Sequence, residues 1–219
     1  MTPSSDRDAI LRAVLDHVPF DGWSAAAYAA GVRESGVASD RAALAFSNGI
    51  DGVAAYFGMS VVRKLEVALE GLADSEPSIR KRVTVGVRTF IGLIAEHREQ
   101  VRRMSPLARS RGTSGGLGVL YRITDIIWRA AGDRSTDFSF YTKRGLLAGV
   151  VTATYWYWLD DESDGFADTW AFLDRRIADV LRIQKLRGRA EKFAERMGAP
   201  LNTLRKSPFG KGFGSPTSR

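Results

Sequence analysis

The stretch that decides the fold runs from Gly132 to Asp161 and reads GDRSTDFSFYTKRGLLAGVVTATYWYWLDD. It begins with turn-forming and capping residues and contains no proline. A hydroxyl of Ser135 or Thr136 is suited to cap the free N–H groups of a first helical turn. Asp137 then lies where the helix dipole favours negative charge. The sequence therefore predicts one helix from about residue 137 to residue 160.

The second half of this predicted helix is apolar on every side, because no charged residue occurs from Gly145 to Leu159. A helix of this kind is either a membrane span or the central helix of a folded core. The uncharged segment is only ~22 Å long at the usual rise per residue, whereas the hydrocarbon layer of a bilayer is ~30 Å thick. We therefore predict a central core helix.

Small residues recur along one side of this helix, at Gly145, Ala148, Gly149 and Thr152. They allow either the close approach of a neighbouring helix or a slot for a flexible apolar ligand. Under the ligand hypothesis, the slot lies between the central helix and three neighbouring helices, and a leucine at position 149 would fill it. The candidate lipid-binding residues are Phe90, Ile94, Leu120, Leu147, Gly149, Val150, Val151, Thr154 and Trp158.

The rest of the chain also predicts helices, because apolar residues recur at spacings of three and four and sustained alternation is absent. We expect an all-α protein of about nine or ten helices. Ser24 is predicted to cap the second helix, and Ser39 or Asp40 the third. The predicted helices cover about 6–17, 24–34, 39–46, 49–72, 77–96, 117–131, 137–160, 166–187 and 189–204.

The sequence also predicts two interruptions between helices and a division of the chain into four parts. The segment 96–118 contains Pro106 and a glycine-rich run, so it reads as a broken stretch with a flexible loop. Gly188 reads as a hinge. The predicted parts are a helix-turn-helix-like unit at 1–48, a ligand-binding and dimerisation core at 49–187, an amphipathic helix at 188–205 and a disordered tail at 206–219.

The composition argues against an enzyme. The chain has no cysteine and only two histidines, His17 and His97, which are far apart. Disulfides, thiolate metal sites and cysteine nucleophiles are thereby excluded. The acidic turn after Asp160 loosely resembles a calcium loop, but Ala171 stands where such a loop needs a bidentate glutamate. No carboxylate lies in an apolar segment with a basic partner. We predict no catalytic residue, no metal and no cofactor.

The positive charge is concentrated near the C-terminus. Residues 182–219 hold ten Lys and Arg against two Glu, a net charge of +8, whereas the remainder is close to neutral. This asymmetry indicates an anionic partner, either lipid head groups or nucleic acid. The N-terminus has neither an apolar signal region nor an arginine-rich transit pattern, so a cytoplasmic location is expected.

The segment 189–204 carries a narrow apolar stripe flanked by basic residues. Such a helix is too short to span a bilayer, but it can lie in the head-group layer. The alternative is that the stripe packs on the rest of the protein or on a second copy of the chain. The candidate membrane-binding residues are Arg189, Lys192, Phe193, Arg196, Met197 and Leu201.

The first three predicted helices resemble the DNA-binding part of the tetracycline-repressor family. The resemblance lies in VPFDGWS at 18–24, the turn at Gly36-Val37 and an aromatic residue, Phe46, at the end of the third helix. In those repressors the third helix enters the major groove. Here Arg41 is its only cation, and duplex binding requires several phosphate contacts. We therefore expect no nucleic-acid partner.

A second resemblance is more extensive. The pattern Trp128-x-x-Ala-Gly-Asp-x-Ser-Thr-Asp-Phe-x-x-Tyr-Thr-x-Arg144 is similar to the signature of the ubiquinone (coenzyme Q) biosynthesis accessory family. These are lipid-binding proteins that include the ninth Coq protein of mitochondria and its bacterial relatives. The similarity continues through residues 168–176 and includes residues 18–23, and it spans about residues 8–200.

This family resemblance implies a tetracycline-repressor-like helical bundle without catalytic residues that forms homodimers. It implies an apolar pocket for isoprenoid quinone intermediates or phospholipid. It also implies presentation of these lipids to the di-iron demethoxyubiquinone hydroxylase, with the last helix touching an anionic membrane. The implied partner-binding residues are Ile127, Asp137, Phe140, Tyr141 and Arg144, of which Phe140 departs from the family's usual Trp.

The expected protein is thus a lipid-binding accessory protein on the inner membrane of a bacterium, because no transit pattern is seen. Two other functions are kept as alternatives. One is a ligand-sensing transcriptional regulator of the tetracycline-repressor family. The other is an enzyme in its own right.

Overall fold

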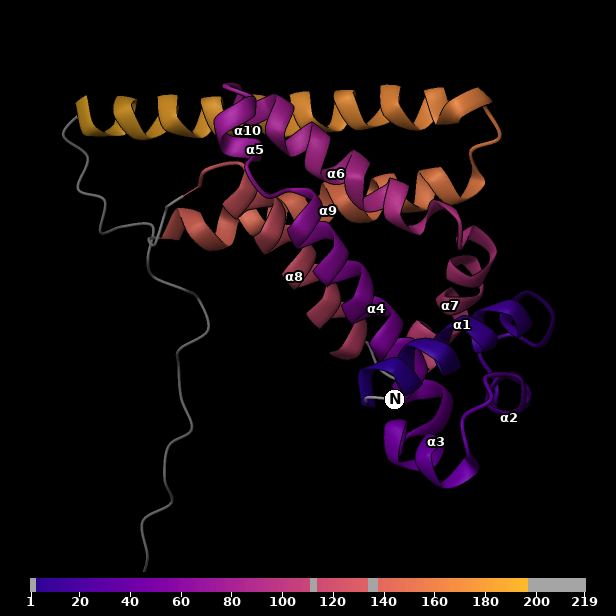
Figure 1. Cartoon of the computed structure of the whole chain (residues 1–219). Helices are drawn as coiled ribbons and strands as arrows, with labels where there is room; N and C mark the ends of the chain where they lie inside the picture. Colours follow the sequence, from indigo (N-terminus) through magenta and orange to yellow (C-terminus); the bar gives the residue numbers. More distant parts are fainter. Residues whose placement is uncertain (1–2, 111–113, 134–137, 197–219) are drawn as a thin grey trace, which may run out of the picture. The chain divides into compact units, whose positions relative to one another are not determined.

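The computed structural model describes the backbone of residues 3–110, 114–133 and 138–196, and the side chains of 4–104, 116–133, 142–180 and 182 (Figure 1). No strand occurs in these residues, which confirms the predicted all-α class. The chain forms two compact units, residues 1–177 and 178–219. The helices are α1 (Pro3–Asp21), α2 (Ala25–Glu34), α3 (Ser39–Ala45), α4 (Gly49–Ala68), α5 (Leu72–Ser75), α6 (Ile79–Ala95), α7 (Arg98–Ser110), α8 (Ser114–Ala130), α9 (Phe138–Asp160) and α10 (Ala167–Arg196), with a 3-10 turn at Asp164–Phe166.

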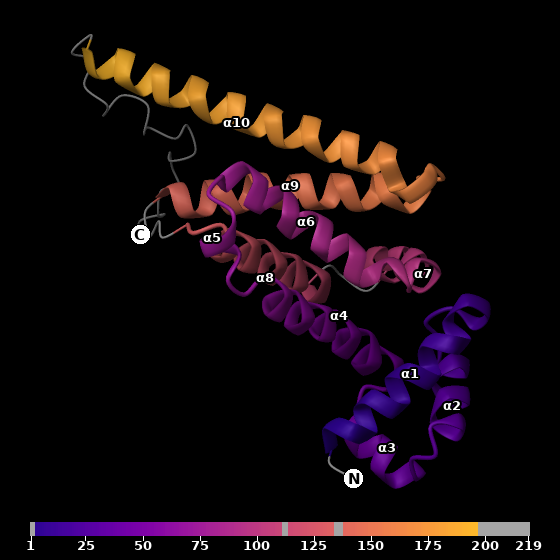
Figure 2. The same ribbon diagram turned by 45° about the horizontal axis from the view of Figure 1, so that its top comes forward.

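Helices α1, α2 and α3 pack on one another (Figure 2). The Ser24 hydroxyl accepts a hydrogen bond from the backbone N–H of Ala27 at 3.2 Å, so the predicted cap of α2 is confirmed. A Cβ added at Gly31 would lie 2.4 Å from a methyl carbon of Val14. The absence of a side chain at Gly31 is therefore what lets α1 and α2 approach closely.

Arg41, the single cation of α3, pairs with a residue of α1. Arg41 forms an ion pair with Asp6, whose side chain is almost fully buried. The backbone at the end of α3 is also fixed, because Arg7 Nε donates to the carbonyl of Ala45 at 3.1 Å. The helix-turn-helix shape is thus stabilised by the charge that a DNA-binding helix would direct to phosphate.

The core of the first unit lies among α4, α6, α8 and α9, which pack on one another. A Cβ at Gly86 of α6 would lie 2.8 Å from Ile127 of α8, so this glycine sets how closely the two helices approach. Helix α7 joins the core to the N-terminal helices. Trp23 Nε1 donates to the carbonyl of Gln100 at 2.8 Å, and the Gln100 amide donates to the carbonyl of Leu15 at 3.0 Å.

Helix α7 corrects the predicted broken stretch. It continues as a helix through Pro106, although proline removes a backbone hydrogen bond and normally bends or ends a helix. Its first turns are anchored by the buried side chain of Val101 and by the Gln100 contacts, and this tertiary anchoring outweighs the local preference. The glycine-rich run is also helical from Ser114 onward.

Three further boundaries differ from the sequence-based prediction. Helix α10 runs through Gly188 without a break, since one glycine inside a helix costs only about 1 kcal/mol. The N-cap of α3 is Ala38, which has no side-chain hydrogen bond to offer, rather than Ser39 or Asp40. Helix α6 begins at Ile79, two residues after Pro77, and the Ser78 side chain accepts from the N–H of Lys81.

Some predicted features lie outside the described residues. These are the caps Ser135 and Thr136, the membrane-binding candidates Met197 and Leu201, and the tail at 206–219. Among the helices that are described, none combines the length and apolar character required to cross a bilayer.

Replacing Arg41 with Ala should lower the free energy of unfolding by about 1–3 kcal/mol, because it leaves the buried Asp6 carboxylate without its ion-pair partner. Urea denaturation measures this change. Arg33→Ala, at an exposed position of α2, is the matched control and should have little effect. Equal stability of the two variants would show that the Asp6–Arg41 pair does not stabilise the N-terminal unit.

Candidate functional site

The buried side of α9 brings together most of the predicted lipid-binding residues. Thr154 and Trp158 are fully buried, and α9 packs on α6 and α8. Leu120 of α8 is half-buried. The other predicted wall residues on α6 and α9 are all buried, and these are Phe90, Ile94, Leu147, Val150 and Val151. These residues therefore belong to one apolar region of the first unit.

Gly149 lies on a different side of α9. This open face of α9, defined by Gly145, Gly149 and Trp156, is exposed, and a Cβ added at either glycine meets no atom within 4 Å. In the described part of the chain these glycines therefore do not mediate close helix packing, which corrects that interpretation. A leucine at Gly149 would extend into open space rather than fill an enclosed slot.

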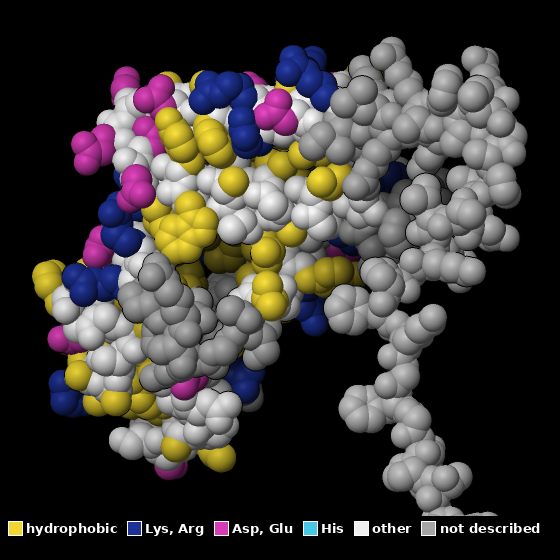
Figure 3. Space-filling view, turned by 180° about the vertical axis from the view of Figure 1, so that it is seen from behind, with side chains coloured by type: hydrophobic (Ala, Val, Ile, Leu, Met, Phe, Trp, Pro, Cys, Tyr) yellow, Lys and Arg dark blue, Asp and Glu magenta, His cyan; other side chains and the backbone are white. Residues whose placement is uncertain are grey.

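Large hydrophobic side chains are exposed on both α8 and α9. Leu117 and Tyr121 of α8 are about half exposed, as is Trp156 of α9. Tyr157 is partly covered, because its ring stacks on Phe172 of α10 at 4.5 Å between ring centres. Figure 3 shows a face of the molecule on which hydrophobic side chains gather around a hollow. The first unit therefore has apolar surface beyond what its core requires.

Two hollows of the described chain lie away from the predicted lipid-binding residues. One, of about 410 Å³, lies where the end of α4 and α5 meet α8, and Glu66, Glu70 and Arg129 line it. The other, of about 420 Å³, is lined by Arg7, Tyr56 and other residues of α1 and α4. Charged walls of this kind do not suit an isoprenoid chain.

The first turns of α9 are held by buried charge. Arg144 is only 5% exposed, and its guanidinium lies 2.7 Å from Asp125 and 3.6 Å from Asp133. The Lys143 ammonium lies 2.7 Å from the same Asp133 carboxylate. Trp128 Nε1 donates to the backbone carbonyl of Lys143 at 3.0 Å. Two acidic residues of the α8 end thus neutralise two consecutive cations of α9.

This burial corrects the expected exposure of part of the partner-binding patch. Arg144 is held inside the fold by its carboxylate partners, and Ile127 is fully buried against α6. The sequence predicted an exposed helix end, because this half of the helix carries a mix of aromatic and basic residues. The side chains of Phe140 and Tyr141, and all of Asp137, lie outside the described residues.

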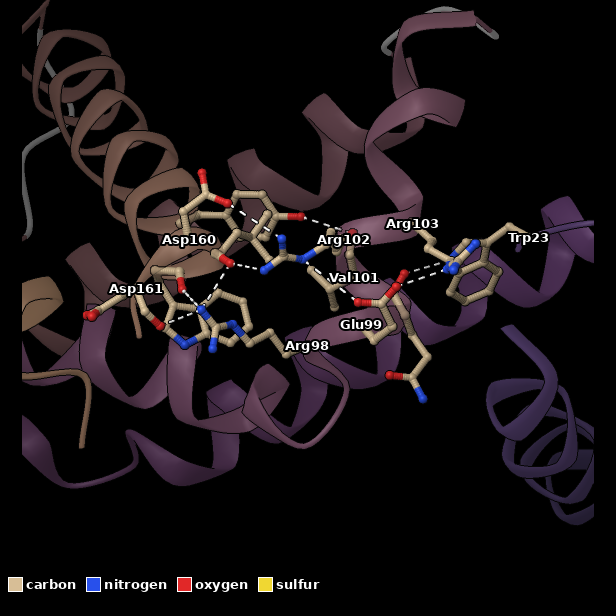
Figure 4. A network of polar contacts seen from close by, with 12 residues as sticks. Trp23, Arg98, Glu99, Val101, Arg102, Arg103, Asp160 and Asp161 are labelled. Carbon is tan, nitrogen blue, oxygen red and sulfur yellow. Dashed lines mark hydrogen bonds and ion pairs between the residues drawn. The ribbon is translucent and has the colours of Figure 1, made fainter. Parts of the chain in front are cut away.

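The last turn of α9 is capped by arginines from α7 (Figure 4). Arg98 Nη2 donates to the carbonyls of Trp158, Leu159 and Asp161 at 2.8, 3.0 and 2.6 Å. Arg102 donates to the Leu159 carbonyl and forms an ion pair with Asp160. These cations satisfy carbonyls that the helix leaves unpaired and face the negative end of its dipole.

Asp161 joins the end of α9 to the start of α10. Its carboxylate accepts hydrogen bonds from the backbone and side chain of both Ser163 and Thr169. Burial alone would raise the pKa of Asp161, but these hydrogen bonds outweigh burial and hold the pKa below its usual range. Asp161 therefore stays ionised and fixes the α9–α10 turn.

Sequence reasoning missed Arg98, Arg102 and Asp161. Arg98 and Arg102 are four apart, a spacing that places both on one side of a helix, but α7 was not predicted as a helix. Among the described residues, no group of three or more His, Cys, Asp and Glu is arranged to hold a metal ion.

The fold and this site define an all-helical protein with a helix bundle like that of the tetracycline repressors. Residues 113–184 match the COQ9 family. The chain is 34% identical to the rat "Ubiquinone biosynthesis protein COQ9, mitochondrial" over 184 residues, which cover 80% of this chain and 58% of the rat protein. The predicted family resemblance is thereby confirmed, and the chain is a relative of the COQ9 proteins.

Sequence identity and coverage are similar for other animal proteins of the same name. The human protein is 32% identical over 80% of this chain and 57% of its own length. The Drosophila melanogaster protein is 29% identical over 84% of this chain and 58% of its own length. The chain thus spans somewhat more than half the length of the curated relatives it matches.

Replacing Arg144 with Glu should lower the free energy of unfolding by about 3–5 kcal/mol, because it places a third carboxylate beside Asp125 and Asp133 in a buried site. Thermal or urea denaturation measures this change. Arg122→Glu makes the same charge reversal at an exposed position of α8 and serves as the control. A variant at position 144 as stable as that control would contradict the structural role of Arg144.

Replacing Asp161 with Asn should lower the free energy of unfolding by about 2 kcal/mol at pH 7, because its hydrogen bonds to Ser163 and Thr169 weaken. The folded-state pKa is depressed, so the contribution of ionised Asp161 is complete above its unfolded pKa, ~3.9. It is lost as pH falls toward the folded pKa. The difference between wild type and variant should therefore shrink below about pH 4.

Denaturation curves at pH 7 and pH 3 test this dependence. Asp164→Asn, at an exposed position of the same turn, controls for the general loss of a carboxylate. A difference between wild type and Asp161→Asn that grows as the pH falls would have the wrong sign for this mechanism.

Proposed function

We propose that this chain is a non-catalytic lipid-binding accessory protein of ubiquinone biosynthesis. It binds isoprenoid lipid intermediates and presents them to the di-iron hydroxylase that acts on demethoxyubiquinone. The observation that carries the proposal is the similarity to proteins named for ubiquinone biosynthesis, at 32–34% identity over 80% of this chain. No observation favours the alternative of a transcriptional regulator.

The apolar character of α9 supports lipid binding. Its buried side carries Leu147, Val151 and Trp158, and its open face leaves Trp156 exposed. An isoprenoid chain is flexible and apolar, so it gains from contact with surface of this kind. The exposed Leu117 and Tyr121 of α8 add to the apolar area that a ligand, a membrane or a partner could cover.

The hydroxylase is proposed to dock at the N-terminal end of α9. Phe140 and Tyr141 are aromatic residues in its first turn, and aromatic residues are common energetic anchors of interfaces. Arg144 and Ile127 belong to the same patch in the family, but both are buried here. Their proposed contribution is to hold the first turn of α9 in position.

The second unit is proposed to contact an anionic membrane. Helix α10 extends through Arg189, Lys192, Phe193 and Arg196 to its end. A basic amphipathic helix gains about 1 kcal/mol for each Lys or Arg near an anionic surface. The proposed location is peripheral, on the inner membrane of a bacterium, and the protein is proposed to act as a homodimer.

Lipids extracted from the purified protein provide the test of this function. We expect isoprenoid quinones or their biosynthetic precursors to be enriched relative to the membrane of the expressing cell. Mass spectrometry of the extract measures this enrichment. An extract without isoprenoid lipid, or with phospholipids in bulk membrane proportions, would overturn the proposal.

Replacing Phe193 with Glu should abolish flotation with anionic liposomes, because it places a charge in the apolar stripe of α10. High salt should weaken wild-type binding only in part, since the apolar contribution remains. Leu44→Glu makes the same change at an exposed position of α3 and should leave flotation intact. Flotation of the Phe193→Glu protein, or its unfolding, would rule out this membrane contact.

A further inference from the structure

Three buried polar atoms near the C-terminal end of α9 have no hydrogen-bond partner in the described part of the chain. They are Thr154 Oγ1, Trp158 Nε1 and Arg98 Nε. Thr154 and Trp158 are fully buried and four residues apart, so they lie one above the other on the same side of α9. The cluster is therefore local.

Arg98 is held firmly beside this pair. Its guanidinium carbon lies 5.6 Å from the ring centre of Trp158, and its Nη2 atom is engaged by three backbone carbonyls. Figure 4 shows Arg98 reaching from α7 toward Asp161. Because Nη2 is fixed, the unpaired Nε of Arg98 cannot turn away to find water without breaking these bonds.

An unpaired buried polar group destabilises a fold. Most such groups in folded proteins have a partner, and an exception calls for an explanation, of which an additional bound atom is one. The indole N–H and the guanidinium N–H only donate, whereas a threonine hydroxyl donates or accepts. Each of the three can therefore be satisfied by a hydrogen-bond acceptor.

We infer that Thr154, Trp158 and Arg98 form the binding site for a ring-bound carbonyl oxygen, as in a quinone head group. This inference rests on the proposed lipid-binding function and specifies where the polar end of the ligand lies. The rings of Trp158, Tyr155 and Phe166 surround the site, with centres about 6 Å from one another in the two measured pairs. Planar ligands pack well against such rings.

The surrounding charges favour a neutral acceptor over an anion. The positive charge of Arg98 already faces the carbonyls at the end of α9, which is the negative end of the helix dipole. The ionised Asp161 follows directly, and its carbonyl also accepts from Arg98. A phosphate or carboxylate bound here would add negative charge beside the ionised Asp161, whereas the nearby Arg102 is already paired with Asp160.

The same geometry sets the direction of the ligand. Toward the N-terminus, the buried side of α9 continues from Thr154 to Val151, Val150 and Leu147, all apolar. The distance from Trp158 to Leu147 along the helix is ~16 Å. The head group therefore lies at the Trp158 end, with the isoprenoid tail along the apolar side. Entry requires neighbouring side chains to shift, because the three atoms are closed to water.

Two variants remove a polar atom: Thr154→Val keeps the shape of the side chain, whereas Trp158→Phe also removes part of a fully buried ring system. The probe is a water-soluble ubiquinone analogue with a two-unit isoprenoid tail, and calorimetric titration measures its Kd. Each variant should bind this quinone about 5–10-fold more weakly than wild type, the loss expected for one hydrogen bond. An isoprenoid alcohol with the same tail and no ring should bind wild type and variants equally.

The control is Thr152→Val, which makes the same change as Thr154→Val elsewhere on α9 and should leave both affinities unchanged. A second readout is the stability of Thr154→Val without ligand. Because this change removes an unpaired polar group and keeps the side-chain shape, the free energy of unfolding should stay unchanged or rise.

Each outcome is decisive. If wild type binds the quinone and both variants bind it as tightly, the proposed head-group site is wrong while lipid binding stands. If wild type binds neither the quinone nor the alcohol, the proposed function itself fails. If Thr154→Val loses stability without ligand, the Thr154 hydroxyl is satisfied by structural water and the inference is overturned.

Discussion

The structure depends on how the two ends of one apolar helix are neutralised. One side of helix α9 is buried among apolar side chains, so the polar groups at its ends on that side cannot rely on solvent. At the start, Asp125 and Asp133 pair with Arg144 and Lys143. At the end, one nitrogen atom of Arg98 donates hydrogen bonds to three backbone carbonyls. Because the partners come from α8 and α7, satisfying these ends also fixes where those helices pack.

This constraint gives a physical meaning to the signature between Trp128 and Arg144. Trp128 bonds to the backbone beside Arg144, and Gly132 has a positive φ of 83° that suits the turn between the helices. Arg82 of α6 donates to the carbonyl of Ala131 at 2.9 Å. These residues mainly build the junction of α8 and α9. A resemblance that rests on them is therefore strong evidence for the fold and weaker evidence for any particular ligand or partner.

The helices of the chain were largely predictable because their signals are local. The cap at Ser24 and the periodicity of α4 and α6 require only neighbouring residues. The orientation of α9 was not predictable, because a helix that is apolar on every side gives no indication of which side is buried. The continuation of α7 through Pro106 and the burial of Arg144 depend on partners distant in sequence, Leu15 and Asp125 among them.

The buried side and the open face of α9 are suited to different kinds of contact, which the sequence alone could not distinguish. The buried side combines apolar residues with the unpaired atoms of Thr154 and Trp158, an arrangement suited to one oriented ligand. The open face presents Trp156 with Gly145 and Gly149, so among these three residues the exposed indole is the one side chain that can donate a hydrogen bond. A surface with few directional bonds tolerates many apolar partners, whereas a buried donor set selects by chemistry. Selectivity for a quinone head group would therefore come from the buried side, and association with membranes or partners from the open face.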